Sequence, residues 1–146
     1  MWRNMLDQTT SIILFFAAIL IIGGLLFVFV SMAKNSPRSL DVEKYRSRWL
    51  SIETQLSRND ISSHTLCVLN ADKLLDQALR DRGIAGKTMA ERMKSCQGKW
   101  TNGNGLWAAH KVRNKLAHET DAAIDYDRAK QALIAYKQGL KDLGAI

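Results

Sequence analysis

The sequence predicts an all-α fold, in which an N-terminal transmembrane helix precedes a bundle of four to five helices. An unbroken apolar run occupies residues 12–30. In the later segments, apolar residues recur at steps of three and four, as on one side of an amphipathic helix. No segment shows the alternating pattern of a half-buried strand. The 146 residues therefore leave room for one small domain after the apolar run.

The apolar run from Ile12 to Val30 has the length of a membrane-spanning helix. It contains 19 residues, and no charged residue occurs between Asp7 and Lys34. About 20 residues at roughly 1.5 Å each cross the hydrocarbon core. A cleaved signal peptide is the alternative, because Ser31-Met32-Ala33 offers small residues where a signal peptidase cleaves. The run exceeds the usual core of a signal peptide, so we expect residues 1–33 to be a membrane anchor.

The positive charges beside the span predict its orientation, because Lys and Arg are retained on the cytoplasmic side. Arg3 precedes the span, whereas several basic residues follow it closely: Lys34, Arg38, Lys44, Arg46 and Arg48. We therefore expect the N-terminus outside and the domain in the cytoplasm. In that reducing compartment Cys67 and Cys96 should be free thiols, and their spacing matches no zinc motif.

The chain is basic, with 21 Lys and Arg against 14 Asp and Glu and a formal net charge of +7. Arg3 and Asp7 cancel each other, so the excess positive charge belongs to the part after the span. A basic domain under a membrane is attracted to anionic lipid headgroups or to nucleic acid. Composition alone does not separate these two partners.

Helices are expected after a short linker at 34–39, in which Asn35-Ser36-Pro37 ends the spanning helix. The first would begin near Asp41 and end at Asn59-Asp60. Either Asn59 or Asp60 could cap a second helix that runs to about Arg82. The apolar stripe of the first helix is Val42, Tyr45, Trp49, Ile52 and Leu56, and that of the second is Cys67, Ala71, Leu74, Leu75 and Ala78. Gly83 is placed to end the second helix in a left-handed cap.

The segment after Gly83 contains Gly86-Lys87-Thr88, the closing residues of a nucleotide-binding P-loop. The full pattern fails, because its first glycine would fall at Asp81 and a charged helix stands where a buried strand should precede the loop. Thr88 instead fits the cap of a short helix, with Glu91 completing a capping box. Met89 and Met93, with Cys96, would then face the core.

Two further helices complete the predicted domain, which spans residues 40–146. The turn-forming residues from Gly98 to Gly105 predict a loop, because no strand pattern flanks them. A third long helix is expected from about Leu106 to His118. Asp125 is placed to cap the last helix, whose apolar stripe is Ala129, Ala132, Leu133, Tyr136, Leu140 and Leu143.

The third long helix carries two strips of side chains, at about 100° per residue. The strip expected to face the core consists of Leu106, Ala109, Val112 and Leu116. The strip roughly opposite consists of Trp107, His110, Asn114 and His118. An aromatic side chain and two histidines directed away from a core predict a partner-binding surface. A solvated polar face is the alternative.

Arg113 and His118 are five residues apart, so they point about 140° from each other on a regular helix. Asn114 and His118, four apart, can meet, and Asn114 would then orient the imidazole through a hydrogen bond. Two such helices packed antiparallel across a two-fold axis would bring two Arg and two His into one cleft. The alternative is purely structural, with His118 at the helix end and Arg113 paired to an acid such as Glu119.

The segment Arg113-Asn114-Lys115-Leu116-Ala117-His118 lies late in the helical pattern and before a final helix, and it resembles the motif of the HEPN superfamily. The resemblance covers roughly residues 40–143. It implies a homodimer that cleaves RNA without a metal or another cofactor. Under this interpretation Arg113, His118 and Asn114 are catalytic, and the RNA-binding or dimer surface contains Trp107, His110, Lys111 and Lys115. Many HEPN-like domains are inactive, so a non-catalytic membrane-anchored module that binds a partner protein or nucleic acid is the alternative.

The chemistry of such a site follows from its two ionisable residue types. A histidine can remove the ribose 2′-hydroxyl proton or protonate the leaving oxygen, and a guanidinium can neutralise the charge that develops on the phosphate. A metal site is not expected, because His110 and His118 are eight residues apart on one helix, about 12 Å. His64 is interpreted as structural.

Overall fold

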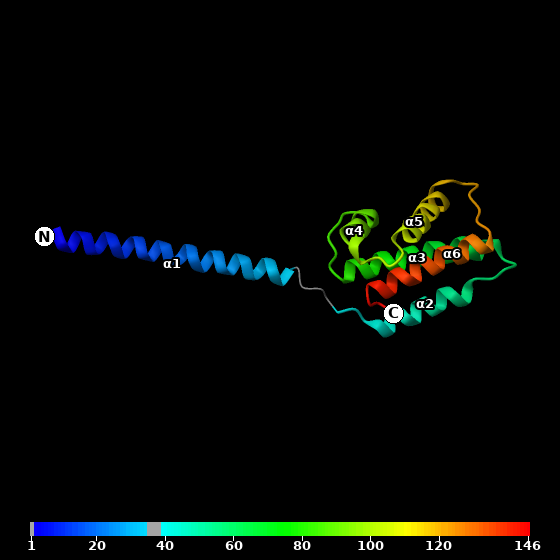
Figure 1. Ribbon diagram of the computed structural model, residues 1–146, viewed down its shortest axis with the longest axis horizontal. Helices are drawn as coiled ribbons and strands as arrows, with labels where there is room; N and C mark the ends of the chain where they lie inside the picture. Colours follow the sequence, from blue (N-terminus) through cyan, green and yellow to red (C-terminus); the bar gives the residue numbers. More distant parts are fainter. Residues whose placement is uncertain (1, 35–38) are drawn as a thin grey trace. The chain divides into compact units, whose positions relative to one another are not determined.

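The computed structural model describes residues 2–34 and 39–146, and every regular element in these two ranges is helical. The chain divides into two compact units, Met1–Pro37 and Arg38–Ile146, drawn in Figure 1 as a long helix and a helical bundle. The all-α prediction is confirmed. The predicted linker at 34–39 lies almost entirely outside the described residues.

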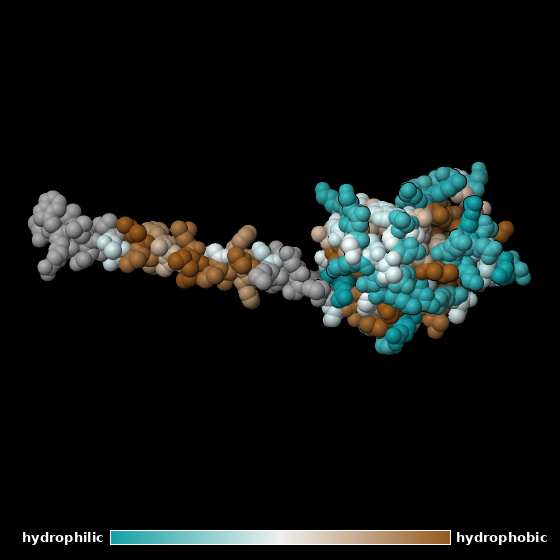
Figure 2. Space-filling view, viewed as in Figure 1, coloured by the Kyte–Doolittle hydropathy of each residue, from teal (hydrophilic) through white to brown (hydrophobic). Residues whose placement is uncertain are grey.

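Helix α1 (Trp2–Lys34) forms the first unit. Its stretch Thr10–Ser31, with 22 residues, is long and apolar enough to cross a membrane. The large apolar side chains of this stretch are exposed in the isolated chain and appear brown in Figure 2. The stretch coincides with the predicted span at residues 12–30. A signal sequence satisfies the same criterion of length and composition.

The second unit contains five α-helices and a short 3₁₀ helix within residues 39–146 (Figure 1). These are α2 (Val42–Gln55), α3 (Ile61–Asp81), α4 (Met89–Ser95), the 3₁₀ helix Gln97–Lys99, α5 (Gly103–His118) and α6 (Tyr126–Asp142). Helix α3 is central, because α2, α4, α5 and α6 all pack against it. Helices α5 and α6 also pack against each other.

Side chains cap the helices at the predicted positions. Asp60, Thr88 and Asp125 each accept a backbone N–H hydrogen bond, at 2.9, 3.2 and 2.8 Å. Gly83 follows the end of α3 with a φ of 75°, in the left-handed region that favours glycine. Helix α5 begins earlier than predicted, at Gly103, because the side chain of Asn102 accepts a hydrogen bond from the Gly105 amide at 3.0 Å.

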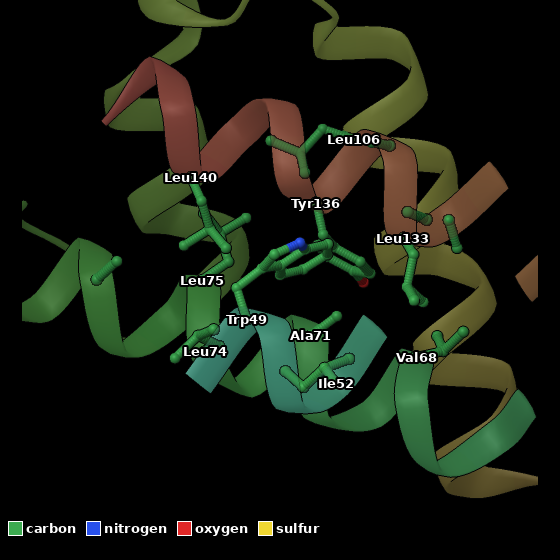
Figure 3. Close-up of a cluster of buried hydrophobic side chains, with 14 of the residues drawn as sticks. Trp49, Ile52, Val68, Ala71, Leu74, Leu75, Leu106, Leu133, Tyr136 and Leu140 are labelled. Atoms are coloured by element: carbon green, nitrogen blue, oxygen red, sulfur yellow. The ribbon is translucent and has the colours of Figure 1, made fainter. Parts of the chain in front are cut away.

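The hydrophobic core is formed by residues of α2, α3, α4, α5 and α6, and Figure 3 shows part of it. The predicted stripes of α3 and α6 are buried throughout, as are Met89, Met93 and Cys96. On α2, the central residues Tyr45, Trp49 and Ile52 are buried. Figure 2 shows hydrophilic side chains over most of the visible surface of the bundle. The core also encloses several polar side chains, and some of them form part of the candidate site.

Candidate functional site

Asp72, on α3, is a carboxylate inside this core and is only 3% exposed. Its Oδ1 accepts hydrogen bonds from His110 Nδ1 on α5 at 2.8 Å and from the Tyr136 hydroxyl on α6 at 2.9 Å. Its Oδ2 lies 3.0 Å from Arg113 Nε on α5. Transfer of a carboxylate out of water is strongly unfavourable unless donors and a counter-charge replace its hydration. Asp72 therefore ties α3 to both α5 and α6.

The donors to Asp72 have defined roles. Burial, together with the nearby Asp72 carboxylate, raises the pKa of Tyr136, so its hydroxyl keeps its proton and donates. His110 directs Nδ1 at the carboxylate, an arrangement in which Nδ1 carries the proton. Arg113 Nε is within ion-pair distance of Asp72, but its N–H is not aligned for a hydrogen bond. The contact with Arg113 is therefore mainly ionic.

Arg113 extends from this buried network to the protein surface, and its side chain is 34% exposed. Its Nη1 donates a hydrogen bond to Asn114 Oδ1 at 3.0 Å. Its Nη2 makes no hydrogen bond or ion pair with the residues that the structure describes. A guanidinium held from behind by Asp72 and at one side by Asn114 is well suited to bind a phosphate oxygen.

A pocket of about 980 Å³ lies beside Arg113, bordered by α3, α4 and α5. Its basic lining residues are Lys73, Arg80, Lys87, Arg92 and Arg113, and its acidic ones are Asp72 and Asp76. Five basic residues against two acidic ones leave an excess of three positive charges. A concave surface with such an excess attracts anions.

Arg92, on α4, is buried at the edge of this pocket and fixes the loop before α4. Its Nε donates to Asp76 Oδ1 at 2.9 Å, and its Nη1 donates to the Gly86 carbonyl oxygen at 2.7 Å. The predicted capping box differs in one bond, because Glu91 Oε2 accepts from the Lys87 amide at 2.6 Å and not from the Thr88 amide. These bonds hold residues 86–88 against α3 and α4.

His118 ends α5 and is exposed. It makes no hydrogen bond or ion pair with the described residues, and it does not line the basic pocket. The predicted hydrogen bond between Asn114 and His118 is not formed. The Asn114 carbonyl oxygen instead accepts from Arg113. The physical reason is that Asp72 holds the Arg113 guanidinium close to Asn114, where it offers a charged and therefore stronger donor.

The prediction that Trp107 and His110 form an outward surface is wrong. His110 is buried, and Trp107 is partly buried and packs against the core. Their rings meet edge to face, with centroids 6.2 Å apart. The buried face of α5 thus includes His110 with Leu106 and Ala109. A histidine can occupy this position because Asp72 satisfies its ring nitrogen.

The exposed part of α5 is basic. Lys111, Lys115 and His118 are all exposed. Lys115 Nζ lies 3.7 Å from Glu119, which is thus not the partner of Arg113. This ion pair is solvent-exposed on both sides and contributes little to stability. The three side chains remain accessible to an anionic partner or to a second copy of the helix.

His64 is buried and connects three segments of the chain, in agreement with a structural role. Its Nδ1 lies 3.1 Å from the Ile124 carbonyl oxygen, and its Nε2 lies 2.7 Å from that of Ser57. Cys67 and Cys96 are free, and burial raises the pKa of both thiols. Among the described residues, no group of three or more His, Cys, Asp or Glu is placed to hold a metal ion.

Sequence reasoning missed Asp72 and Arg92 as components of the site. The sequence does contain a pattern that indicates Asp72. This residue lies four positions after Val68 and seven before Leu79, so helical spacing places it at the edge of the apolar face of α3. An acidic residue at that position indicates a buried partner. Its identity cannot be read from local spacing, because the donors lie 38 and 64 residues away in the sequence.

No family model matches the chain, and no curated protein or solved structure matches it. The function of the site must therefore be inferred from its own residues.

Proposed function

We propose that residues 40–146 form a HEPN-like domain, tethered to a membrane by α1, that cleaves RNA as a homodimer without a metal. The environment of Arg113 is the observation that supports this most strongly. Asp72 and Asn114 each lie 3.0 Å from its guanidinium nitrogens, and the side chain remains partly exposed beside a basic pocket. His118 is exposed at the end of the same helix.

In the proposed reaction, His118 of one copy removes the proton from a ribose 2′-hydroxyl, and the resulting oxygen nucleophile attacks the adjacent phosphorus. The bond from phosphorus to the 5′-oxygen of the next nucleotide breaks. His118 of the other copy donates a proton to that leaving oxygen. Arg113 neutralises the charge that develops on the phosphoryl oxygens. The products are a 2′,3′-cyclic phosphate and a 5′-hydroxyl, and Asn114 serves by orienting Arg113.

The geometry of one helix supports a homodimer. Arg113 and His118 point about 140° apart on α5, so one copy does not direct both at the same phosphate. Two copies of α5 packed antiparallel across a two-fold axis would place Arg113 of one copy near His118 of the other. Exposed Lys111 and Lys115 would line the cleft and attract the RNA backbone.

We infer that the N-terminus lies outside and the domain lies in the cytoplasm, where RNA is present. The basic residues that follow the span support this orientation, because positively charged flanks remain on the cytoplasmic side. The anchor would confine cleavage to RNA that reaches the membrane surface.

The proposal is tested by RNA cleavage with the full chain in nanodiscs of zwitterionic lipid and with EDTA present. The wild type should release products that end in a 2′,3′-cyclic phosphate. His118→Ala should lower the rate by roughly 10²- to 10⁴-fold, the range for loss of a general acid or base. Lys99→Ala is the matched control, since it also removes an exposed basic side chain outside the pocket and should cleave normally.

Two further results test whether His118 takes part in RNA cleavage. His118→Ala should change the free energy of unfolding by less than about 0.5 kcal/mol, because an exposed side chain without a partner contributes little. A loss of cleavage without a loss of stability would then assign His118 to the chemistry. Absence of cleavage by the wild type, or equal cleavage by His118→Ala, would refute the ribonuclease proposal.

A second candidate function is a non-catalytic membrane-anchored module that binds nucleic acid or a partner protein. The position of His118 favours it, because no described residue orients the imidazole and the basic pocket lies elsewhere. RNA binding by the full chain, with no cleavage under any condition and no effect of His118→Ala, would select this alternative.

A further inference from the structure

We propose that the basic pocket between α3, α4 and α5 binds, through Lys73 and Lys87, the phosphate groups of the RNA strand that neighbour the cleaved phosphate, which Arg113 contacts at the edge of the same pocket. The pocket is separate from His118, which does not line it. This inference rests on the proposed function, in which RNA is the substrate. It gives the RNA strand a second region of contact besides the proposed cleavage site.

Lys73 and Lys87 are the two pocket cations that form no ion pair. Among the described residues, neither side chain has a carboxylate partner within ion-pair distance. The other cations differ, because Arg80 and Arg92 both pair with Asp76, and Arg113 pairs with Asp72. Both lysines are exposed. Their ammonium groups are thus available to an incoming phosphate without the loss of an existing ion pair.

The backbone around Lys87 is fixed in place, although its side chain is exposed. Arg92 holds the preceding carbonyl of Gly86 at 2.7 Å, and Glu91 accepts the Lys87 amide at 2.6 Å. Gly86 has a φ of 153°, and a Cβ there would lie 2.7 Å from the Arg92 backbone nitrogen. The chain is therefore closely packed at this point. A lysine on a fixed loop loses less conformational entropy on binding than one on a mobile loop.

The pocket is extended along α3, which suits a strand better than a single anion. Asp72 and Asp76 are one helical turn apart, about 6 Å at 1.5 Å per residue. They anchor Arg113 from α5 and Arg92 from α4 respectively. The positive charge is therefore spread along the groove, with Arg113 near one carboxylate and the Lys87 loop near the other. A nucleic-acid strand carries its phosphates one after another along its length and therefore suits an extended groove, whereas the phosphates of a free polyphosphate are closer together.

The test measures binding rather than cleavage, so its failure is distinct from failure of the ribonuclease proposal. The full chain with His118→Ala is placed in zwitterionic nanodiscs with EDTA, and anisotropy of labelled U12 and A12 RNA gives Kd. Adding K73Q and K87Q should raise Kd on the order of tenfold for both sequences, because phosphate contacts are independent of sequence. The slope of log K against log salt should fall in magnitude by about 1.4, at roughly 0.7 per contact for a single strand.

The matched control carries K94Q and K141Q in the same background. It removes the same charge from exposed lysines outside the pocket, and Lys94 lies on α4 like the pocket residue Arg92. Its Kd should change by less than about twofold. Equal weakening by both double variants would show that only net charge matters and would overturn the proposal. An unchanged Kd in K73Q/K87Q would also overturn it.

A competition with inorganic triphosphate separates an RNA strand from a free polyphosphate. Displacement of the labelled RNA by triphosphate should require a much higher concentration of phosphate groups than its displacement by unlabelled RNA. Equal potency at equal phosphate concentration would assign the pocket to a free polyphosphate and overturn the RNA assignment. If the wild type cleaves no RNA but K73Q/K87Q selectively loses binding, the pocket assignment stands and the ribonuclease proposal fails.

Discussion

Asp72 Oδ2 on α3 lies 3.0 Å from Arg113 Nε on α5, so a buried carboxylate stands directly behind a partly exposed guanidinium. The other oxygen of the same carboxylate accepts from His110 and from Tyr136. One side chain therefore serves both the packing of three helices and the direction of Arg113. A substitution at Asp72 should affect stability and ligand binding together.

The variant Asp72→Asn is predicted to destabilise the domain by about 2–3 kcal/mol. The amide has no negative charge to compensate Arg113. If its carbonyl oxygen keeps the bonds from His110 and Tyr136, its NH₂ group faces the guanidinium as a second donor. Denaturant unfolding of the full chain in detergent micelles, followed by circular dichroism, measures the change. Asp121→Asn, at an exposed position, should shift stability by less than about 0.5 kcal/mol. A similar small shift for Asp72→Asn would contradict the role of the buried carboxylate.

The variant Gly86→Ala is predicted to destabilise the loop before α4 by about 1–3 kcal/mol. Its φ of 153° is unfavourable for an L side chain, and the new Cβ would meet the Arg92 backbone nitrogen at 2.7 Å. Gly98→Ala is the matched control, because a Cβ at that position meets no atom within 4 Å. Amide hydrogen exchange of residues 84–92 should accelerate in Gly86→Ala alone. Equal exchange in both variants would argue against a closely packed loop.

The variant Tyr45→Phe should destabilise the domain in a manner that depends on pH. The Tyr45 hydroxyl donates to Asp81 at 2.6 Å, and this bond is the main reason that the pKa of Asp81 is lowered. Because the pKa is lowered in the folded state, the stabilisation is present above the unfolded value of about 3.9 and is lost as pH falls through the folded value. Burial, followed by the bond to Asp81, raises the pKa of Tyr45, so the bond persists up to at least about pH 10.

Unfolding measured between pH 2.5 and pH 8 checks this expectation. Near pH 7, the free energy of unfolding of Tyr45→Phe should be about 1 kcal/mol lower than that of the wild type. The loss is small because Asp81 is partly exposed and solvent weakens the interaction. The difference from the wild type should narrow below about pH 4. Tyr126→Phe is a suitable control, since that hydroxyl makes no hydrogen bond with the described residues and its ring contacts are retained. A pH-independent difference for Tyr45→Phe would contradict the linkage to Asp81.

The intact chain is predicted to retain residues 1–33 and to remain in the membrane fraction after an alkaline wash. The Thr10–Ser31 stretch is long enough to span a bilayer, and an anchor is not removed by disruption of charge interactions. Intact mass spectrometry distinguishes the alternatives. A mature chain that begins close to Lys34 would establish a cleaved signal peptide and exclude the anchor.

The orientation of the domain is measured in intact cells that carry the variant Lys141→Cys, which adds an exposed cysteine. The native thiols should react slowly, because Cys67 and Cys96 are buried and their pKa values are raised. A membrane-impermeant maleimide should label the new cysteine only after the cells are permeabilised. Labelling of intact cells would place the domain outside and remove its access to cytoplasmic RNA.

The helical class, the long apolar N-terminal helix and most of the core are predictable from the sequence alone, because these features depend on local periodicity and composition. Tyr45, Trp49 and Ile52 on α2 follow steps of three and four, and burial of that stripe is the dominant way for the helix to exclude apolar surface from water. The caps at Asp60, Thr88 and Asp125 are equally local, since each side chain bonds a backbone amide two or three residues away.

The side of α5 that is buried and the contacts of Arg113 and Asn114 depend instead on how the helices pack. Helical periodicity places His110 on the strip opposite the core strip, although His110 is only about 40° from Leu106 around the helix. Asp72 from α3 decides this, because a buried carboxylate requires hydrogen-bond donors and a counter-charge. His110 and Tyr136 supply the donors, and Arg113 supplies the counter-charge. These partners meet through the packing of distant helices, so no local pattern in the sequence specifies them. The arrangement of Arg113 and Asn114 is a consequence of that packing.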